Sequence, residues 1–352
     1  MRIKLEKRAE PSRFMLFATP VAAVILTILI GAVLFQSLGY DGLGTVKEIF
    51  FTPILASYKW QDVATKAAPL ILIALGLSLG NQAKVWNIGA EGQYIAGALA
   101  GALVAYFTPQ VTSHWIIIPM ILAGVLGGAA WAAIPAFLKT KLNVNEVLTS
   151  LMLVYVALQL LGYLVTGPWK DPSGHNFPQT APFSDAQLLP HSIAGTVIPP
   201  GLVIAFGLML VFWLVVSRSV YGFQVRVVGA APSAARYAGF SANRTVWSTL
   251  LISGGMAGLA GILEATSQLG QLNLGFPSNY GFTAIIVSFL GRLHPVGVFI
   301  AGIVLAITYV GGQVAQTTVH VPSASGGIFQ ALMLFLILAG DVLVRYRLVF
   351  KS

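Results

Sequence analysis

Apolar stretches separated by short polar gaps run along almost the whole chain. Their lengths are those of membrane-spanning helices, because about 20 apolar residues are needed to cross a hydrocarbon core of roughly 30 Å. The stretch at 281–291 is too short to cross alone as a straight helix, so it predicts a half-helix or the continuation of a broken one. The pattern predicts an all-α, polytopic membrane protein of about ten transmembrane helices, at residues 14–37, 67–83, 88–107, 115–138, 146–166, 200–217, 246–265, 281–291, 295–315 and 326–344.

The composition agrees with a protein whose solvent is lipid. Hydrophobic residues make up 57% of the 352 positions and charged residues 9%, whereas typical soluble domains carry roughly 25% charged residues. The 37 glycines suit helices that pack closely on small residues. The net charge of +9 does not indicate nucleic-acid binding, because Lys and Arg lie in the gaps between apolar runs rather than in one stripe.

The placement of Lys and Arg also predicts the orientation in the membrane. With the N-terminus inside and the spans alternating, 16 basic residues lie on the cytoplasmic side and 4 outside. We therefore expect cytoplasmic termini. The expected organisation is a cytoplasmic N-terminal segment at 1–13, a transmembrane domain at 14–345 and a cytoplasmic tail at 346–352. The first span is longer than the core of a signal peptide and is expected to be retained.

Three connections between spans are long. Residues 39–66 are expected outside, with the apolar segment Ile49–Leu55 resting on the membrane interface. Residues 167–199, rich in Pro, Ser and Gly, form the largest external loop, and residues 218–245 form the largest internal loop.

The internal loop contains the signals of a short helix. Pro232 lacks the N–H that would be unsatisfied at a helix start, and Gly239 can end the helix. The residues between them include Ala234, Ala235, Arg236 and Tyr237. A helix of about two turns is not stable alone in water. We therefore expect it to dock into a groove on a soluble partner.

Four segments, in order, resemble ABC permeases of the ribose/nucleoside importer type. The internal loop is similar to that family's coupling loop, G-x-x-x-R-x-x-G-x-x-x-x-A-A-x-Y-x-G, at Gly222, Arg226, Gly229, Ala234, Ala235, Tyr237 and Gly239. The other segments are Asn87–Ala102, which resembles the Asn-Ile-Gly-x-Glu-Gly-Gln signature of the nucleoside and simple-sugar branch, Asn145–Tyr155, and Gly281–Gly297. Val154 departs from the branch, which commonly has Asn at that position.

The resemblance implies one subunit of a multi-chain importer in the inner (plasma) membrane of a prokaryote. A second permease subunit, often non-identical, would complete the translocation pathway. Cytoplasmic P-loop ATPase subunits would drive it, and an external solute-binding lipoprotein would deliver a cargo that is often a nucleoside. The residues that the resemblance assigns to coupling with the ATPase are Arg226, Gly229, Ala234, Ala235, Arg236, Tyr237 and Gly239.

Asn87, Glu91 and Gln93 are unusual immediately before an apolar helix. A charge at the membrane centre costs about 2.5–3.5 kcal/mol on insertion scales. The open start of a helix supplies free N–H groups and partial positive charge, so a broken helix here can line a pathway for a polar solute. The alternative is that Glu91 only caps this helix at the cytoplasmic boundary.

Three further residues are pathway candidates. Glu264 is either a pore-facing group, together with Gln268, Gln271 and Asn273, or a helix-end residue paired with water or a neighbouring subunit. Asn279 and Phe282, with Tyr280 between them, lie at the start of the short span, where a polar loop and glycine predict a discontinuous helix around a pathway. Phe282 can stack on a nucleobase, although packing against lipid or the core is the preferred interpretation.

Sequence signals for catalysis, ATP binding and metal binding are missing. The sequence has no G-x-x-x-x-G-K-[ST], no cysteine, and five dispersed histidines: His114, His175, His191, His294 and His320. We therefore expect a transport subunit that is not an enzyme, with no cofactor and no metal. An ion-coupled secondary transporter of a small polar solute remains the alternative function. The pairs Gly97/Gly101 and Gly254/Gly258 predict helix-packing faces.

Overall fold

The computed structural model describes residues 2–7, 12–190, 192–193, 196 and 198–351. Arg8 and His191, considered above, lie outside the described residues. The helices are α1 Arg13–Ser37, α2 Gly42–Val46, η1 Lys47–Phe51, α3 Thr52–Leu55, η2 Ser57–Lys59, α4 Trp60–Gln82, α5 Ala90–Phe107, η3 His114–Ile116, α6 Ile117–Leu142, α7 Glu146–Thr166, η4 Asp185–Gln187, α8 Pro200–Arg218, α9 Val220–Ala230, α10 Pro232–Tyr237, α11 Ala242–Glu264, η5 Ala265–Leu269, α12 Tyr280–Leu290, α13 Pro295–Thr318 and α14 Ser325–Arg345. Two strands, β1 Arg2–Lys7 and β2 Tyr346–Lys351, complete the elements.

Seven helices in the described part of the chain are long and apolar enough to cross a membrane. They include α1, α4, α6, α7, α8, α11 and α13. The three remaining predicted spans correspond to α5, α12 and α14. The predicted half-length of the 281–291 span is confirmed, because α12 has only 11 residues. In α5, a polar first turn and many small residues lower the hydropathy, although the helix has 18 residues.

The core of the bundle is built on α4 and α11, which are the most deeply buried of the long helices. Helices α5 and α6 pack against α11, and α8, α12 and α13 pack against α4. Glycines form the contact between α5 and α11. The two helices are so close there that a Cβ added at Gly97 would lie 2.7 Å from the carbonyl oxygen of Gly258. The same Gly258 meets Gly128 of α6. The predicted glycine packing faces are therefore confirmed.

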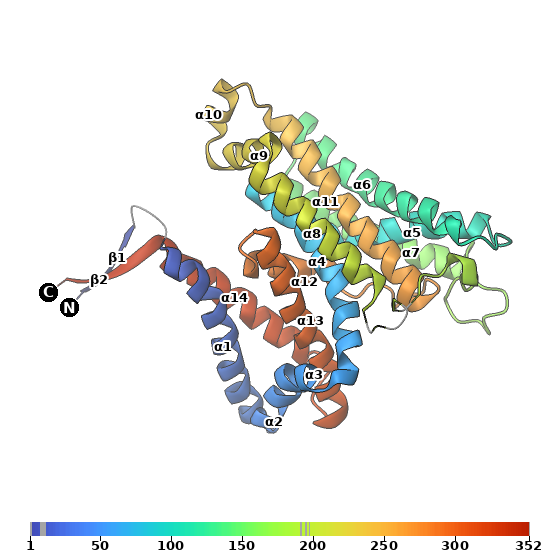
Figure 1. Cartoon of the computed structure of the whole chain (residues 1–352), viewed down its shortest axis with the longest axis horizontal. Helices are drawn as coiled ribbons and strands as arrows, with labels where there is room; N and C mark the ends of the chain where they lie inside the picture. Colours follow the sequence, from blue (N-terminus) through green and yellow to red (C-terminus); the bar gives the residue numbers. More distant parts are fainter. Residues whose placement is uncertain (1, 8–11, 191, 194–195, 197, 352) are drawn as a thin grey trace.

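Helices α1 and α14 pack on each other, α2 joins α1 to η1, and η1 and α3 lie against α13 (Figure 1). Ile49 and Phe50 are buried there, and a Cβ at Gly311 of α13 would come within 2.5 Å of the Ile49 carbonyl carbon. Ile49 and Phe50 therefore pack against the protein, whereas Phe51 is 49% exposed, and the placement of Ile49–Leu55 at the membrane interface stays a prediction. Ile54 and Leu55 remain exposed.

The two ends of the chain lie together. β1 and β2 pair antiparallel from Arg2 opposite Lys351 to Lys7 opposite Tyr346. An entirely helical chain was expected, and this ribbon is the exception. The alternation of Ile3 and Leu5 with charged neighbours has the period of a strand. Figure 1 shows α9 and α10 at one end of α8 and α11, and the loop after α7 at the opposite end.

The long loop after α7 is an ordered cover rather than a free connection. Thr180 N–H donates to the Leu272 carbonyl at 2.9 Å, and Phe183 N–H donates to the Gly270 carbonyl at 2.7 Å. The Leu189 N–H reaches the carbonyl of Thr266 at 3.1 Å. These bonds fix the loop on the segment that joins α11 to α12.

Candidate functional site

Asn87, in the connection between α4 and α5, and Gln93, in the first turns of α5, form a reciprocal pair of amides. Asn87 Nδ2 donates to Gln93 Oε1 at 2.8 Å, and Gln93 Nε2 donates to Asn87 Oδ1 at 3.0 Å. Asn87 Nδ2 also reaches Ser253 Oγ of α11 at 2.9 Å, and Ser150 Oγ of α7 accepts from the Ile88 N–H at 3.2 Å. Both amides are buried and hydrogen-bonded, as buried polar groups must be. The signature therefore joins the start of α5 to α7 and α11.

Glu91 caps a different helix from the one expected. Its Oε1 accepts from the Asn279 N–H at 2.9 Å and its Oε2 from the Gly281 N–H at 2.6 Å, at the start of α12. The alternative that Glu91 caps α5 is wrong: at the start of α5 it is Asn87 Oδ1 that accepts from the Gly89 N–H, at 3.1 Å. Unsatisfied N–H groups and the positive end of the helix dipole make the start of α12 a good partner for a carboxylate. Glu91 is only 1% exposed.

Glycine is required where α12 meets α5. A Cβ at Gly281 would lie 2.6 Å from the Cα of Glu91 and 2.8 Å from the carbonyl carbon of Ala90. Asn279 immediately precedes α12 and has a left-handed backbone with φ of 59°, a conformation that asparagine tolerates better than most residues. The starts of α5 and α12 are therefore held together by backbone proximity as well as by Glu91.

Glu264 at the end of α11 pairs with a cation from α4. Lys66 Nζ lies 3.3 Å from Glu264 Oε1, and the Tyr280 hydroxyl donates to the same oxygen at 3.4 Å. The ammonium group also lies 5.5 Å from the centroid of the Tyr280 ring. Lys66 was missed as a site residue. The sequence signal that could have found this ion pair is a single basic residue, Lys66, and a single acidic residue, Glu264, each near the predicted outer end of a span.

Aromatic rings fill the space between these two polar groups. Tyr94 stacks on Phe276 with ring centroids 4.8 Å apart, and its ring meets that of Tyr280 edge-on at 6.0 Å. Tyr94 is fully buried, and its hydroxyl has no hydrogen-bond partner within the described ranges. Tyr309 donates to the carbonyl of Ser278 at 3.2 Å.

The other candidates near Glu264 point elsewhere. Gln271 donates to Gln179 of the external loop at 3.1 Å, and the Asn273 side chain accepts from the Gly275 N–H. Gln268 contacts its neighbour Ser267. Phe282 is half-buried on α12. The structure therefore pairs Asn87 with Gln93, Glu91 with Asn279, and Glu264 with Lys66 and Tyr280.

The helix predicted between Pro232 and Gly239 is present as α10, and Gly239 follows it with φ of 81°. Ala235 is 2% exposed and faces the protein, whereas Tyr237 is 95% exposed. Ala234, Arg236 and Gly239 are also exposed. Helix α10 therefore presents a small apolar and basic surface at one end of the bundle (Figure 1).

A second helix in the internal loop, α9, was not expected. Arg226 donates to the carbonyl of Val216 and so ties α9 to the end of α8. Gly229 lies against the end of α4, where an added Cβ would come within 3.0 Å of the Ala83 Cα and would overlap the Gln82 carbonyl oxygen. Two of the residues assigned to coupling are thus anchors between helices rather than parts of an exposed surface.

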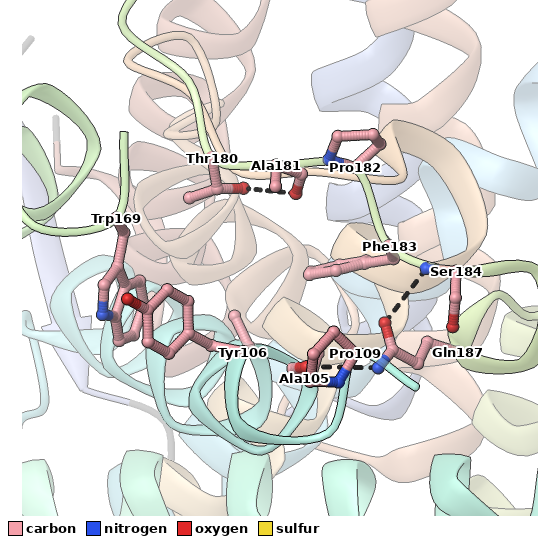
Figure 2. Close-up of a pocket in the computed structure, with 11 residues that line it drawn as sticks. Ala105, Tyr106, Pro109, Trp169, Thr180, Ala181, Pro182, Phe183, Ser184 and Gln187 are labelled. Atoms are coloured by element: carbon pink, nitrogen blue, oxygen red, sulfur yellow. Dashed lines mark hydrogen bonds between the residues drawn. The ribbon is translucent and has the colours of Figure 1, made fainter. Parts of the chain in front are cut away.

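A cavity of about 320 Å³ lies beside the ordered external loop. Figure 2 shows its aromatic lining of Tyr106, Trp169 and Phe183. Tyr106 and Trp169 stack with centroids 5.6 Å apart. Gln187 closes one side by donating to the Ala105 and Thr108 carbonyls at 3.2 and 3.0 Å, at the end of α5. The Thr180 hydroxyl and the Gln187 amide at the cavity are hydrogen-bonded within the protein.

No group of three or more potential metal-ligating side chains occurs among the residues that the structure describes. The chemistry of the site is therefore that of amides, paired charges and aromatic rings.

Comparison with known proteins identifies the family to which this chain belongs. Residues 60–338 match the family described as the branched-chain amino acid transport system permease component. A glucose ABC transporter permease protein of Haloferax volcanii is 35% identical over 99% of this chain and 93% of its own length. A nucleoside ABC transporter permease protein of Lactococcus lactis is 25% identical, over 90% of this chain and 89% of its own. A guanosine ABC transporter permease protein of Bacillus subtilis is 27% identical, over 93% and 94%.

Lactococcus lactis and Bacillus subtilis each have a second permease protein that also matches this chain. The family match covers well over half of the chain, and the Haloferax volcanii relative is similar along its full length. The chain belongs to the branched-chain amino acid transport system permease component family and is a multi-pass ABC importer permease of the prokaryotic plasma membrane.

Proposed function

We propose that this permease forms the translocation pathway for a nucleoside or a related sugar. It would work with a second, non-identical permease, cytoplasmic P-loop ATPases and an external solute-binding lipoprotein. The relatives that carry two permease proteins support the heteromeric arrangement. The names of the relatives support the solute class, because glucose and nucleosides are both uncharged rings with adjacent hydroxyl groups.

We propose ten membrane crossings with both termini and α10 in the cytoplasm. Pairing of β1 with β2 requires both ends of the chain on one side, as an even number of crossings gives. The count of 16 basic residues inside against 4 outside supports this orientation. Crossings beyond the seven long helices would come from α5, α14 and the half-helix α12 with the polar loop before it.

The observation that carries the coupling role is the contrast within α10. Tyr237 is 95% exposed on a six-residue helix in which Ala235 alone is buried. A helix this short is held by its neighbours, and an exposed tyrosine next to an exposed arginine suits a protein interface. The two residue types are enriched at such interfaces. An ATPase that moves on binding ATP would displace α10 through this surface.

Displacement of α10 would reach the transmembrane helices through α9. The Tyr221 hydroxyl donates to Ser248 Oγ of α11 at 2.8 Å, and Gln224 Nε2 donates to Thr245 Oγ1 of α11 at 3.3 Å. Arg226 links the same helix to α8. Helix α9 is therefore bonded to two of the membrane helices that it would have to move.

For the pathway we propose Asn87, Glu91, Gln93, Glu264, Asn279 and Phe282. Polar side chains within membrane helices face a bundle interior or a water-filled cavity and mark solute routes. Lys66 neutralises Glu264, and backbone N–H groups satisfy Glu91. A route with compensated charges suits an uncharged solute better than an ion.

The coupling role is tested with the double variant Ala235→Asp/Gly239→Asp in the reconstituted transporter. Added carboxylates on and beside α10 should abolish transport-coupled ATPase activity while the complex still assembles in the membrane. Gly327→Asp is the matched control, because Gly327 is exposed at the start of α14 with open space around it. Normal coupled ATPase activity in the double variant would refute the coupling role.

A further inference from the structure

Residues 81–91 join α4 to α5, and we call this segment the connector. It contacts both ends of the half-helix α12. At the C-terminal end, Gln82 Nε2 donates to the Leu293 carbonyl at 2.7 Å, and Asn81 Nδ2 donates to Ser288 Oγ at 3.3 Å. Arg292, which follows α12, also donates to Thr19 Oγ1 of α1, so the connector and α1 both hold this end.

An aromatic contact strengthens the same end. The ring of Trp86 stacks on Phe289 of α12, with centroids 5.8 Å apart and planes 27° from parallel. At the N-terminal end, the last residue of the connector, Glu91, accepts hydrogen bonds from the Asn279 and Gly281 N–H groups. The connector therefore contacts both ends of a helix of 11 residues, through hydrogen bonds at each end and through ring stacking at the C-terminal end.

The connector also contacts α9, the helix next to the coupling helix α10. Gly229 of α9 is so close to the end of α4 that a Cβ there would lie 3.0 Å from both the Gln82 carbonyl carbon and the Ala83 Cα. Backbone thus meets backbone, without a flexible side chain between the two helices. Gln82 touches α9 with its carbonyl group and the end of α12 with its side-chain amide.

Left-handed residues lie next to these contacts, in the connector and directly after α12. Arg292 and Leu293, directly after α12, both have φ of 56°. Lys84 in the connector has φ of 56° as well. Left-handed conformations are unfavourable for residues other than glycine, and they cluster where a structure switches between states. Such positions at helix ends are also where hinges absorb φ and ψ changes.

We propose that Gln82 is the positioning residue that carries displacement of α9 to α12, and that α12 is the element that gates the pathway. The proposal rests on the proposed coupling role of α9 and α10. When α9 moves, it would shift Gln82. The amide would then pull the Leu293 carbonyl and tilt α12 about the left-handed residues. Glu91 would keep the other end of α12 at the start of α5.

The test uses single-cysteine labelling, because the chain contains no cysteine of its own. Ile285→Cys places a thiol at a half-buried position of α12. In the complete transporter in proteoliposomes, its rate of reaction with a polar maleimide is compared between the nucleotide-free and the ATP-trapped states. Gln82→Met is then added, since methionine keeps the length of the side chain and removes the N–H donor. Solute transported per ATP hydrolysed is measured in the same preparations.

We expect the labelling rate at position 285 to differ between the two states with Gln82 in place. In Gln82→Met, both this difference and the solute-to-ATP ratio should fall by about threefold to tenfold, the range that loss of one hydrogen bond gives. Gln313→Met, at an exposed glutamine of α13, is the control and should change neither. If the Gln82→Met transporter does not assemble, Trp86→Leu is used instead. This variant removes the ring stacking on Phe289 at the C-terminal end of α12 and should also lower the labelling difference and the solute-to-ATP ratio.

Two results would overturn the proposal. One is a labelling rate that does not depend on nucleotide with Gln82 in place, because α12 would then not move. The other is a Gln82→Met transporter with an unchanged nucleotide response and an unchanged solute-to-ATP ratio. These two results can be distinguished from failure of the proposed coupling role, which would appear as normal transport-coupled ATPase activity in Ala235→Asp/Gly239→Asp.

Discussion

Gly281→Ala is the sharpest perturbation of the proposed pathway. The added methyl group would lie 2.6 Å from the Glu91 Cα and 2.8 Å from the Ala90 carbonyl carbon. These are backbone atoms of α5, so no side chain can rotate away. The start of α12 must therefore separate from α5, which lengthens the 2.6 Å hydrogen bond from the Gly281 N–H to Glu91 Oε2.

The size of the effect follows from these two losses. Overpacking a tight contact costs typically about 1–3 kcal/mol. Loss of a hydrogen bond to a charged group costs about 1.5–3 kcal/mol. The free energy of unfolding should therefore fall by about 2.5–6 kcal/mol. At roughly 2 °C per kcal/mol for a long chain, the melting temperature should fall by about 5–12 °C.

The assay is the thermal stability of the purified permease in detergent, followed by solute uptake in the reconstituted transporter. Gly207→Ala on α8 is the matched control, because nothing lies within 4 Å of a Cβ at Gly207. This control should keep the wild-type melting temperature and uptake. A Gly281→Ala permease with the same melting temperature as Gly207→Ala would refute the close contact between α5 and α12.

Lys66→Met leaves the Glu264 carboxylate without its cation and should lower the free energy of unfolding by about 2–4 kcal/mol. This value is at the low side of the range for buried ion pairs, because the Lys66 side chain is 25% exposed. Glu264→Gln in the same chain should restore most of that loss in a denaturation or thermal-shift assay, and an equally unstable double variant would contradict the pairing. Asn87→Ala leaves the Gln93 amide unsatisfied and should cost about 1–3 kcal/mol, with recovery in Asn87→Ala/Gln93→Leu. Tyr237→Ala should leave the permease as stable as wild type within about 0.5 kcal/mol, since the side chain is 95% exposed, while solute-stimulated ATPase activity falls.

Local signals in the sequence predicted much of the fold. Spans can be recognised because lipid demands long apolar segments. Pro232 and Gly239 mark the start and end of α10 because helix ends depend on the few residues next to them. The glycine pairs predicted close packing because only small residues let helix backbones approach. The strand alternation at Ile3 was overlooked because the basic charges there already had a topological interpretation.

The candidate site was predicted as a set of residues, but its connections were not. Glu91 and Asn279 are 188 positions apart, and Lys66 and Glu264 are 198 positions apart. Pairs at such separation leave no periodic pattern in a single sequence. Asn87 and Gln93 are only six positions apart, yet their pairing depends on a backbone break that places both amides in the core. The ordering of the external loop likewise depends on partners near Leu272.

The central claim is that ATP hydrolysis by separate subunits drives solute movement through this permease. The most direct measurement is uptake of radiolabelled nucleoside and glucose into proteoliposomes. The permease would be reconstituted alone under an ion gradient, and in parallel with its partner permease, ATPase and binding protein. We predict uptake of at least one solute in the complete system with ATP, and none by the chain alone. Concentrative uptake by the chain alone, without nucleotide, would contradict the account.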